Sequence, residues 1–137
     1  MPDRRAEVFF YGLFMDPDVL RDKGIAAEDG EVALVRGFAL RIGQRAALLP
    51  DPTGRVYGIL MSLPLPDLER LYSEPSVQAY RPEAVLVHLK TDEVIAALCY
   101  NLPTPPGPGE RNPEYVEKLR STARKVGLPP EYVASLR

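Results

Sequence analysis

The sequence predicts a mixed α+β domain, in which helices flank a curled or barrel-like sheet of about five to seven strands. Apolar runs of strand length follow one another at short intervals, and strands so close along the chain favour a sheet that curls on itself. Between and after these runs, apolar residues recur at helical spacing. A chain of 137 residues is long enough to bury one core. We therefore expect residues 1–137 to form a single domain.

The composition excludes several classes of protein. Apolar residues make up 45% of the chain and charged residues 26%, with a formal net charge of −2, which are ordinary values for a globular protein. Lysines and arginines are spread without a basic block, which argues against nucleic acid or an anionic membrane as a partner. Residues 1–6 are polar rather than an export segment, and no apolar run is long enough to span a bilayer. We expect a cytoplasmic protein, and its oligomeric state stays open.

Metal-ligating residues are scarce. With one cysteine and one histidine in the chain, a structural zinc site is excluded, and the acidic clusters that a carboxylate site needs are not evident. Cys99 stands inside an apolar run of strand length, which is typical of a small core residue. His88 falls on the strand face opposite Val85 and Val87, so we expect a partly exposed side chain. We therefore expect no metal.

The first predicted element is a buried strand, at about residues 7–11, that breaks at Gly12. Because glycine lacks a Cβ, the backbone there can turn sharply and present N–H groups to a small anion. A short helix follows, with Asp16 as its N-cap, Pro17 at its first position and Gly24 at its end, and its positive end adds to the attraction. The loop after Tyr11 is therefore a candidate carboxylate site, and an ordinary glycine turn is the alternative.

Two further regions are predicted to be strands. Residues 31–42 are rich in Val, Leu and Phe and are interrupted by Gly37, so we expect a long or bulged strand. A short apolar piece at residues 46–49 leads to Pro50-Asp51-Pro52-Thr53-Gly54, which predicts a strong turn. The next strand covers residues 55–63, and the glycine in its interior indicates a bulge or a close approach of backbone or ligand.

The rest of the chain alternates between helical and strand patterns. In order, we expect a helix within residues 64–73, a hairpin of strands at 82–90 and 93–101, an irregular proline-rich loop at 103–109, a helix from Asn112 to Gly127, and a short helix after Pro130. The loop has four prolines and two glycines among its seven residues, so it cannot form regular structure, and we expect it to cross the surface or an opening.

Glu74 is the best candidate for acid–base chemistry. It stands where the helix of Leu68 and Leu71 ends, and Pro75 forces the backbone out of the helix there. A carboxylate between an apolar helix and a strand can be partly buried with a raised pKa, which suits proton transfer near neutral pH. A surface glutamate in a loop is the alternative.

Other polar residues are weaker candidates. The Tyr80 hydroxyl can orient a ligand and the Arg81 guanidinium can clamp a carboxylate, although a core-rim tyrosine and a solvated arginine are the ordinary alternatives. Tyr100 ends its strand and either lines a pocket mouth or caps the core. Gln44 and Arg45 lie between two apolar pieces, where a guanidinium either meets a substrate carboxylate or is solvated.

Several segments, taken in order, resemble a known family. They are the Tyr11-Gly12 loop, residues 50–60, the helix of Asp67 to Leu71 leading to Glu74, Tyr80-Arg81-Pro82, Tyr100 and residues 127–132. In their order and spacing the chain resembles the gamma-glutamylcyclotransferase-like family, which includes the AIG2-like proteins. The resemblance runs through most of the chain and implies the same curled-sheet fold.

The resemblance also implies an activity. In such proteins the Tyr-Gly loop supplies backbone donors that hold the α-carboxylate of the substrate, and a glutamate matched by Glu74 shuttles a proton. The reaction needs no cofactor or metal: the α-amine of a γ-glutamyl amine or amino acid attacks its own γ-carbonyl and releases 5-oxoproline and the amine. The residues then expected to bind this small-molecule substrate are Tyr11, Gly12, Leu13, Phe14, Met15, Tyr80, Arg81 and Tyr100.

The chain departs from the family pattern at two places. Leu13 and Phe14 stand where the family commonly has a small hydroxyl residue and an asparagine, and Pro75 follows Glu74 where glycine is common. Backbone donation survives such a change, whereas side-chain hydrogen bonds from the loop do not. These departures motivate an alternative function, a small-carboxylate binding or regulatory module with little or no turnover, and a third, in which the domain is structural and its site vestigial.

Overall fold

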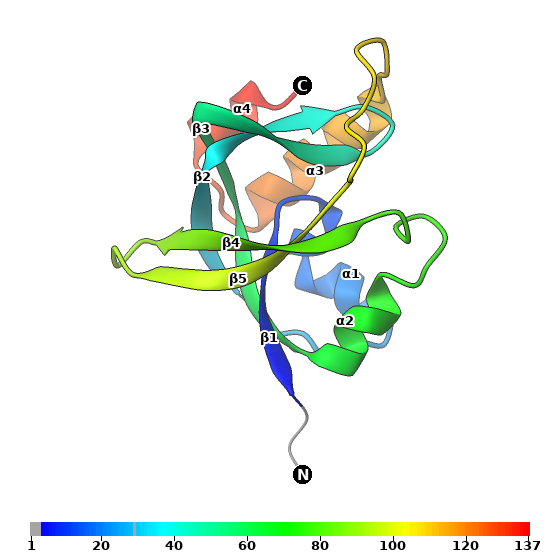
Figure 1. The fold of residues 1–137 in the computed structure, drawn as a ribbon, viewed down its shortest axis with the longest axis vertical. Coiled ribbons are helices and arrows are strands. Elements are labelled where there is room, and N and C mark those ends of the chain that lie inside the picture. Colours follow the sequence, from blue (N-terminus) through cyan, green and yellow to red (C-terminus); the bar gives the residue numbers. More distant parts are fainter. Residues whose placement is uncertain (1–3, 29) are drawn as a thin grey trace.

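The fold is seen in a computed structural model that describes residues 4–28 and 30–137 (Figure 1). The elements are β1 (Arg5–Phe10), the 3-10 turn η1 (Leu13–Met15), α1 (Pro17–Asp22), β2 (Glu31–Ile42), β3 (Ala46–Pro64), α2 (Leu65–Leu71), β4 (Arg81–Leu89), β5 (Val94–Asn101), α3 (Pro113–Lys125) and α4 (Pro130–Ser135). The polar segment at residues 1–6, which we expected not to be an export signal, lies partly outside the described residues.

The described strands curl into a ring of five, in the order β1-β3-β2-β4-β5 (Figure 1). Neighbouring strands are antiparallel except at the closure, where β1 meets β5 in parallel through the pair Val8 and Leu98. The expected α+β fold with a curled sheet is therefore confirmed. The ring closes next to the residues that follow β1, which places the glycine loop beside the end of β5.

The two faces of β1 are buried in two different apolar clusters. Phe9 belongs to a cluster that draws residues from all five strands, among them Val35, Val56 and Val87. Phe10, one residue on, belongs to a second cluster between the sheet and the helices. Because successive strand residues point to opposite faces, a strand covered on both faces is apolar throughout. This explains the uninterrupted apolar run at the start of the chain.

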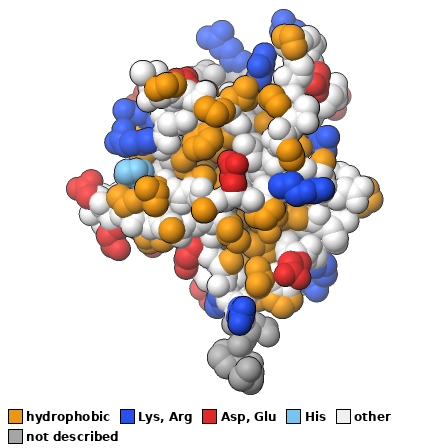
Figure 2. Space-filling view, viewed as in Figure 1, with side chains coloured by type: hydrophobic (Ala, Val, Ile, Leu, Met, Phe, Trp, Pro, Cys, Tyr) orange, Lys and Arg blue, Asp and Glu red, His pale blue; other side chains and the backbone are white. Residues whose placement is uncertain are grey.

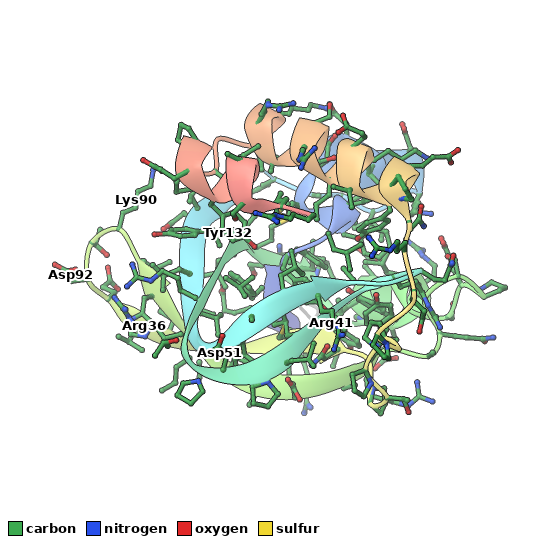
Figure 3. All side chains as sticks on the ribbon, turned by 90° about the horizontal axis from the view of Figure 1, so that it is seen from above. Arg36, Arg41, Asp51, Lys90, Asp92 and Tyr132 are labelled. Atoms are coloured by element: carbon green, nitrogen blue, oxygen red, sulfur yellow. The ribbon has the colours of Figure 1, made fainter. Side chains whose placement is uncertain are left out.

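The helices cover one side of the strands (Figure 3). α3 begins at Asn112, whose side chain accepts the Tyr115 amide, and ends before Gly127, where φ is +86°. Lys125 near its end forms ion pairs with Asp16 and Asp18, each at 2.8 Å, and so ties α3 to the start of α1. None of the helices in the described part of the chain is long and apolar enough to cross a membrane.

The predicted turn at residues 50–54 is wrong. β3 runs through it as one strand of 19 residues, and the pairs Phe38 with Pro50 and Arg36 with Arg55 leave residues 51–54 as a bulge. Asp51, labelled in Figure 3, still accepts the Thr53 amide at 3.1 Å, as in a turn. Because β2 pairs with β3 on both sides of this point, the long-range ladder overrides the local turn.

The outer surface of the β4–β5 hairpin carries exposed apolar groups. Leu86 is 62% exposed and Val94 50% exposed, and Figure 2 shows apolar side chains across the middle of this face with charged ones mostly around its margin. The hairpin turn between Lys90 and Asp92 places Asp92 at φ +71° (Figure 3). Cys99, on β5 of this hairpin, is fully buried as expected, and this burial raises the pKa of its thiol to about 12.

Candidate functional site

A cavity of about 250 Å³ opens where β1 ends. Its walls come from η1, the β2–β3 turn, the segment between α2 and β4, the end of β5 and the start of α3. The aromatic side chains that line it are Phe9, Phe10, Tyr11, Phe14, Tyr72, Tyr80, Tyr100 and Tyr115. The polar ones are Lys23, Gln44, Arg45, Glu74 and Ser76. A few polar groups in an aromatic cavity are typical of a small-molecule site.

Gly12 is required for space rather than for a special backbone angle. The expected turn after Tyr11 is present, but the φ of −112° at Gly12 is open to any residue, so this turn does not depend on the backbone freedom of glycine. A Cβ added there would lie 2.9 Å from the hydroxyl of Tyr115, closer than such contacts occur. The chain turns one step later, where the Met15 amide donates to the Gly12 carbonyl oxygen at 3.1 Å.

Tyr11 anchors the loop to the end of β5. Its hydroxyl donates to the Tyr100 carbonyl oxygen at 2.9 Å, and burial raises the pKa of this hydroxyl. The next residue, Asn101, bridges to β3 because its side chain accepts the Leu48 amide and donates to the Leu48 carbonyl oxygen, both at 2.9 Å. The three segments around the cavity are thus bonded to one another at fixed positions.

Tyr115 meets the loop from the opposite side. Burial raises the pKa of its hydroxyl, and the Leu13 amide beside it opposes that effect. Leu13, Phe14 and Met15 form η1, and the first two of these residues line the cavity. The loop therefore offers backbone groups and apolar side chains to a ligand, but no side-chain hydroxyl or amide.

Glu74 lies on the cavity wall in the turns that follow α2. Both its carboxylate oxygens accept from the Lys23 ammonium, at 3.0 and 2.9 Å. The side chains of Lys23 and Glu74 are 32% and 35% exposed, so the pair is in reach of solvent and of a ligand. Lys23 is the C-cap of α1, brought to Glu74 from 51 residues away. The expected position of Glu74 at a partly buried helix end is found, together with a cation that was not expected.

A continuous run of ring contacts forms one wall. Tyr72 stacks on Tyr100 with centroids 3.8 Å apart and meets Phe14 edge-on at 5.8 Å and Tyr80 at 6.2 Å. Burial raises the pKa of Tyr72 well above its ordinary value. The Lys23 ammonium lies 5.9 Å from the Phe14 ring. These contacts give the cavity a continuous aromatic wall.

Tyr80 lies at the end of this aromatic wall that is next to Arg45. Its hydroxyl donates to the Ala46 carbonyl oxygen at 2.5 Å, and the guanidinium carbon of Arg45 lies 6.0 Å from its ring centroid. Burial raises the pKa of Tyr80 to about 12, and the charge of Arg45 opposes this shift. Tyr80 therefore links the segment after α2 to the β2–β3 turn.

The proline-rich loop at residues 103–109 packs on the β2–β3 turn at residues 43–45. The Glu110 carboxylate accepts the Gly107 amide at 2.6 Å and the Gln44 amide at 3.2 Å. These amides, and to a lesser extent the charges of Arg45 and Arg41, lower the pKa of Glu110. The loop is thus bonded to the turn whose Gln44 and Arg45 line the cavity, but none of residues 103–109 lines the cavity itself.

Most residues predicted to bind substrate line this one cavity. They are Tyr11, Gly12, Leu13, Phe14, Tyr80 and Tyr100, together with the predicted catalytic residue Glu74. Met15 and Arg81 do not. Met15 is 1% exposed in the core between sheet and helices, and the Arg81 guanidinium donates outside the cavity to the carbonyl oxygens of Gln78 and Tyr80.

Several cavity residues were missed from the sequence, among them Tyr72, Tyr115 and Lys23. Tyr72 and Tyr115 stand at helical spacing, so the sequence pattern assigns them to the core. For Lys23, the only local signal is the following Gly24, whose φ is +80°, and this marks a helix end rather than a binding site. Gln44 and Arg45, considered only as weak candidates, also line the cavity. Among residues 4–28 and 30–137 no group of three metal-ligating side chains is close enough to hold an ion.

Comparison with known proteins identifies the family of this chain and other structures with the same fold. The sequence profile of the AIG2-like family matches residues 55–136, more than half of the chain. A search of curated proteins found no match. Among solved structures, one of a gamma-glutamyl cyclotransferase superposes with a TM-score of 0.78 at 18% identity, covering 98% of this chain and 89% of the other.

Two further structures share the fold. An uncharacterized protein from Homo sapiens has a TM-score of 0.77 at 20% identity, over 97% of this chain and 88% of that one. YkqA from Bacillus subtilis has a TM-score of 0.78 at 23% identity over 96% of this chain, which spans 52% of YkqA. These likenesses confirm the fold that the sequence resemblance implied.

Proposed function

Since this chain belongs to the AIG2-like family, we propose that it is a cofactor-independent cyclotransferase that converts a small γ-glutamyl amine or amino acid into 5-oxoproline and the free amine. The observation that carries the proposal is that Glu74 and the Gly12–Phe14 loop line the same cavity. A structural neighbour named as a gamma-glutamyl cyclotransferase lends support through its fold. The cavity volume of about 250 Å³ suits a substrate smaller than a typical drug.

The chemistry requires two protons to leave the attacking nitrogen of the substrate and the leaving nitrogen to be protonated. Glu74 accepts a proton from the α-ammonium, and the freed amine attacks the γ-carbonyl carbon to form the five-membered ring. As the bond from this carbon to the leaving nitrogen breaks, the Glu74 carboxylic acid returns the proton to that nitrogen. The ring nitrogen still carries the second proton of the former ammonium, and it loses this proton through Glu74 to the released amine. The products are 5-oxoproline and the amine in its ammonium form, and Glu74 is restored as a carboxylate.

The surrounding residues position these steps. The loop amides at Leu13 and Phe14 face the substrate's α-carboxylate, and Lys23 holds Glu74 by both oxygens at the cavity wall. The stacked rings of Tyr72 and Tyr100 keep water from the folded glutamyl chain. A fixed carboxylate beside a dry wall suits a reaction that needs proximity more than a strong nucleophile.

The test is release of 5-oxoproline from a panel of γ-glutamyl amino acids and γ-glutamyl amines, followed by mass spectrometry. Glu74→Gln keeps the shape of the side chain but cannot accept the proton, so we expect the rate to fall by about 10²-fold or more. Glu7→Gln, at an exposed position on β1, is the matched control and should keep the wild-type rate. Full activity of Glu74→Gln, or no turnover of any panel member, contradicts the proposal.

A binding or regulatory module is the second candidate. Phe14 favours it, because its ring projects against Tyr72 and under Lys23 where the family commonly has a small polar side chain. This function predicts saturable binding of a γ-glutamyl compound, measured by thermal shift, without any 5-oxoproline. Product formation above background removes this alternative.

A further inference from the structure

Tyrosine hydroxyls gather at the cavity where β1 ends, and two of them are already committed as hydrogen-bond donors. The Tyr11 hydroxyl donates to the Tyr100 carbonyl oxygen at 2.9 Å, and the Tyr80 hydroxyl donates to the Ala46 carbonyl oxygen at 2.5 Å. The ring of Tyr72 lines the same cavity, but its hydroxyl has no hydrogen-bond partner among the described residues. Because a phenol carries one hydrogen to donate, the hydrogen of Tyr72 is available to a ligand.

The remaining tyrosines of the cavity have other surroundings. A Cβ added at Gly12 would lie 2.9 Å from the Tyr115 hydroxyl, so this oxygen is packed against the loop. Burial and the charge of Glu69, a residue that does not line the cavity, raise the pKa of Tyr100, so its hydroxyl lies toward the outside of the cavity. Tyr72 is therefore the cavity tyrosine whose hydroxyl neither bonds to a carbonyl oxygen nor packs on the loop.

Ring contacts fix the side chain of Tyr72. It stacks on Tyr100 with ring centroids 3.8 Å apart, while Phe14 and Tyr80 meet it at 5.8 and 6.2 Å. Tyr72 is the C-cap of α2, and Glu74 follows two residues later. The same short segment thus brings a fixed hydroxyl and the proposed acid–base carboxylate to one cavity.

The surroundings of this hydroxyl keep it protonated. Burial raises the pKa of Tyr72 well above its ordinary value, and the neighbouring Cys99 and three tyrosines of the cavity raise it further. The group is therefore neutral near pH 7 and acts as a donor without losing its proton. A buried donor without a partner costs free energy, so a ligand atom that accepts its hydrogen bond gains from this contact.

We propose that Tyr72 is a further catalytic residue, whose hydroxyl donates a hydrogen bond to the γ-carbonyl oxygen of the substrate as this oxygen becomes negative. This inference rests on the proposed function. When the α-amine attacks the γ-carbonyl carbon, the π electrons of the carbonyl move to its oxygen, and the Tyr72 hydroxyl stabilises this oxyanion. When the bond to the leaving nitrogen breaks, the electron pair returns and the carbonyl group of 5-oxoproline forms.

Other donors at the cavity are engaged elsewhere. The Lys23 ammonium is bonded to both oxygens of Glu74, at 3.0 and 2.9 Å. The charge of Arg45 acts on Glu110, outside the cavity lining, and its guanidinium lies over the ring of Tyr80. The amides of the glycine loop are assigned to the α-carboxylate. The oxyanion at the γ-position therefore needs a donor of its own, and the Tyr72 hydroxyl supplies it.

The test is Tyr72→Phe, which removes the hydroxyl and keeps the stacked ring. We expect kcat for 5-oxoproline release to fall by about 10²-fold, with KM within about twofold of wild type, because the hydrogen bond strengthens only as the charge develops. The variant should unfold at the wild-type temperature, since no hydrogen bond within the protein is lost. Tyr132→Phe (Figure 3) is the matched control, because its hydroxyl also has no hydrogen-bond partner among the described residues and lies outside this cavity. It should keep wild-type kcat and KM.

A second measurement reads the same contact without turnover. The probe is a γ-phosphinate analogue of γ-glutamyl-alanine, in which a tetrahedral anionic group replaces the γ-carbonyl, and calorimetry compares its affinity with that of 5-oxoproline. Tyr72→Phe should weaken binding of the phosphinate by about tenfold or more and leave binding of 5-oxoproline unchanged.

The outcomes separate this inference from the proposed function. Unchanged kcat in Tyr72→Phe, or a raised KM with unchanged kcat, overturns the role of Tyr72 and leaves the cyclotransferase proposal intact. Absence of turnover in wild type overturns the proposed function, and the phosphinate then decides on the contact. Selective loss of phosphinate affinity in Tyr72→Phe supports a hydroxyl directed at the γ-position, and equal affinity of the two proteins overturns it.

Discussion

The two ends of the cavity each carry a cation, but of these two only Lys23 forms an ion pair with a carboxylate in the described part of the chain. At the Lys23 end, the ammonium is bonded to both oxygens of Glu74. At the Arg45 end, the guanidinium lies over Tyr80 while the nearby carboxylate of Glu110 is engaged by backbone amides. Two cations that line one cavity therefore have different partners, a carboxylate for Lys23 and an aromatic ring for Arg45.

The largest effect on this comparison should come from Lys23→Met, which removes the partner of Glu74. Without the ammonium the carboxylate is free to swing into solvent, so we expect kcat/KM for 5-oxoproline release to fall by about tenfold. The free energy of unfolding should change by less than about 1 kcal/mol, because a pair exposed to this extent contributes little to stability. Enzyme assay and urea denaturation measure the two quantities.

Lys118→Met, at an exposed position on α3, is the matched control for loss of a lysine charge. It should leave both quantities unchanged. If Lys23→Met keeps the wild-type rate, Lys23 does not position Glu74, and the two ends of the cavity differ in charge pairing alone.

A smaller effect is expected from Tyr80→Phe at the other end. Loss of the hydroxyl removes the bond to the Ala46 carbonyl oxygen, and we expect the free energy of unfolding to fall by about 1 kcal/mol. The β2–β3 turn then loses one of its anchors beside the cavity. Tyr132→Phe is the control, since the buried Tyr132 hydroxyl (Figure 3) finds no hydrogen-bond partner among the described residues. Equal stability of the two variants would contradict the role given to Tyr80.

Local signals in the sequence were sufficient for most of the fold. The strand at residues 31–42 has the predicted bounds, and Asp16 and Asn112 cap the helices that they were predicted to begin. Such features depend on neighbouring residues. The bulge at residues 51–54 was missed because a proline-rich segment has the same local chemistry in a turn and in a bulge, and only the pairing with β2 distinguishes them.

The site was less predictable than the fold. Glu74 and the glycine loop are brought together at the cavity, but the pairing of Glu74 with Lys23 joins residues 51 positions apart and leaves no trace in either neighbourhood. Met15 was grouped with Phe14 by sequence order, whereas the 3-10 turn directs it into the core. Side-chain direction at a loop depends on the turn that forms there, and a resemblance carried along the chain does not specify it.

The smallest effect should come from pH, through the anchor of the proline-rich loop. The amides of Gly107 and Gln44 lower the pKa of Glu110 below its ordinary value of 4.5, so its contribution to stability is complete above that value and is lost as the pH falls through the lower, folded-state pKa. Thermal unfolding of wild type and Glu110→Gln should therefore differ slightly at about pH 7, and the difference should fade toward about pH 3. If the difference in unfolding temperature instead grows as the pH falls, the Glu110 carboxylate does not hold the loop to the turn that carries Arg45. The position of this turn would then depend on its bonds to Tyr80 and Asn112.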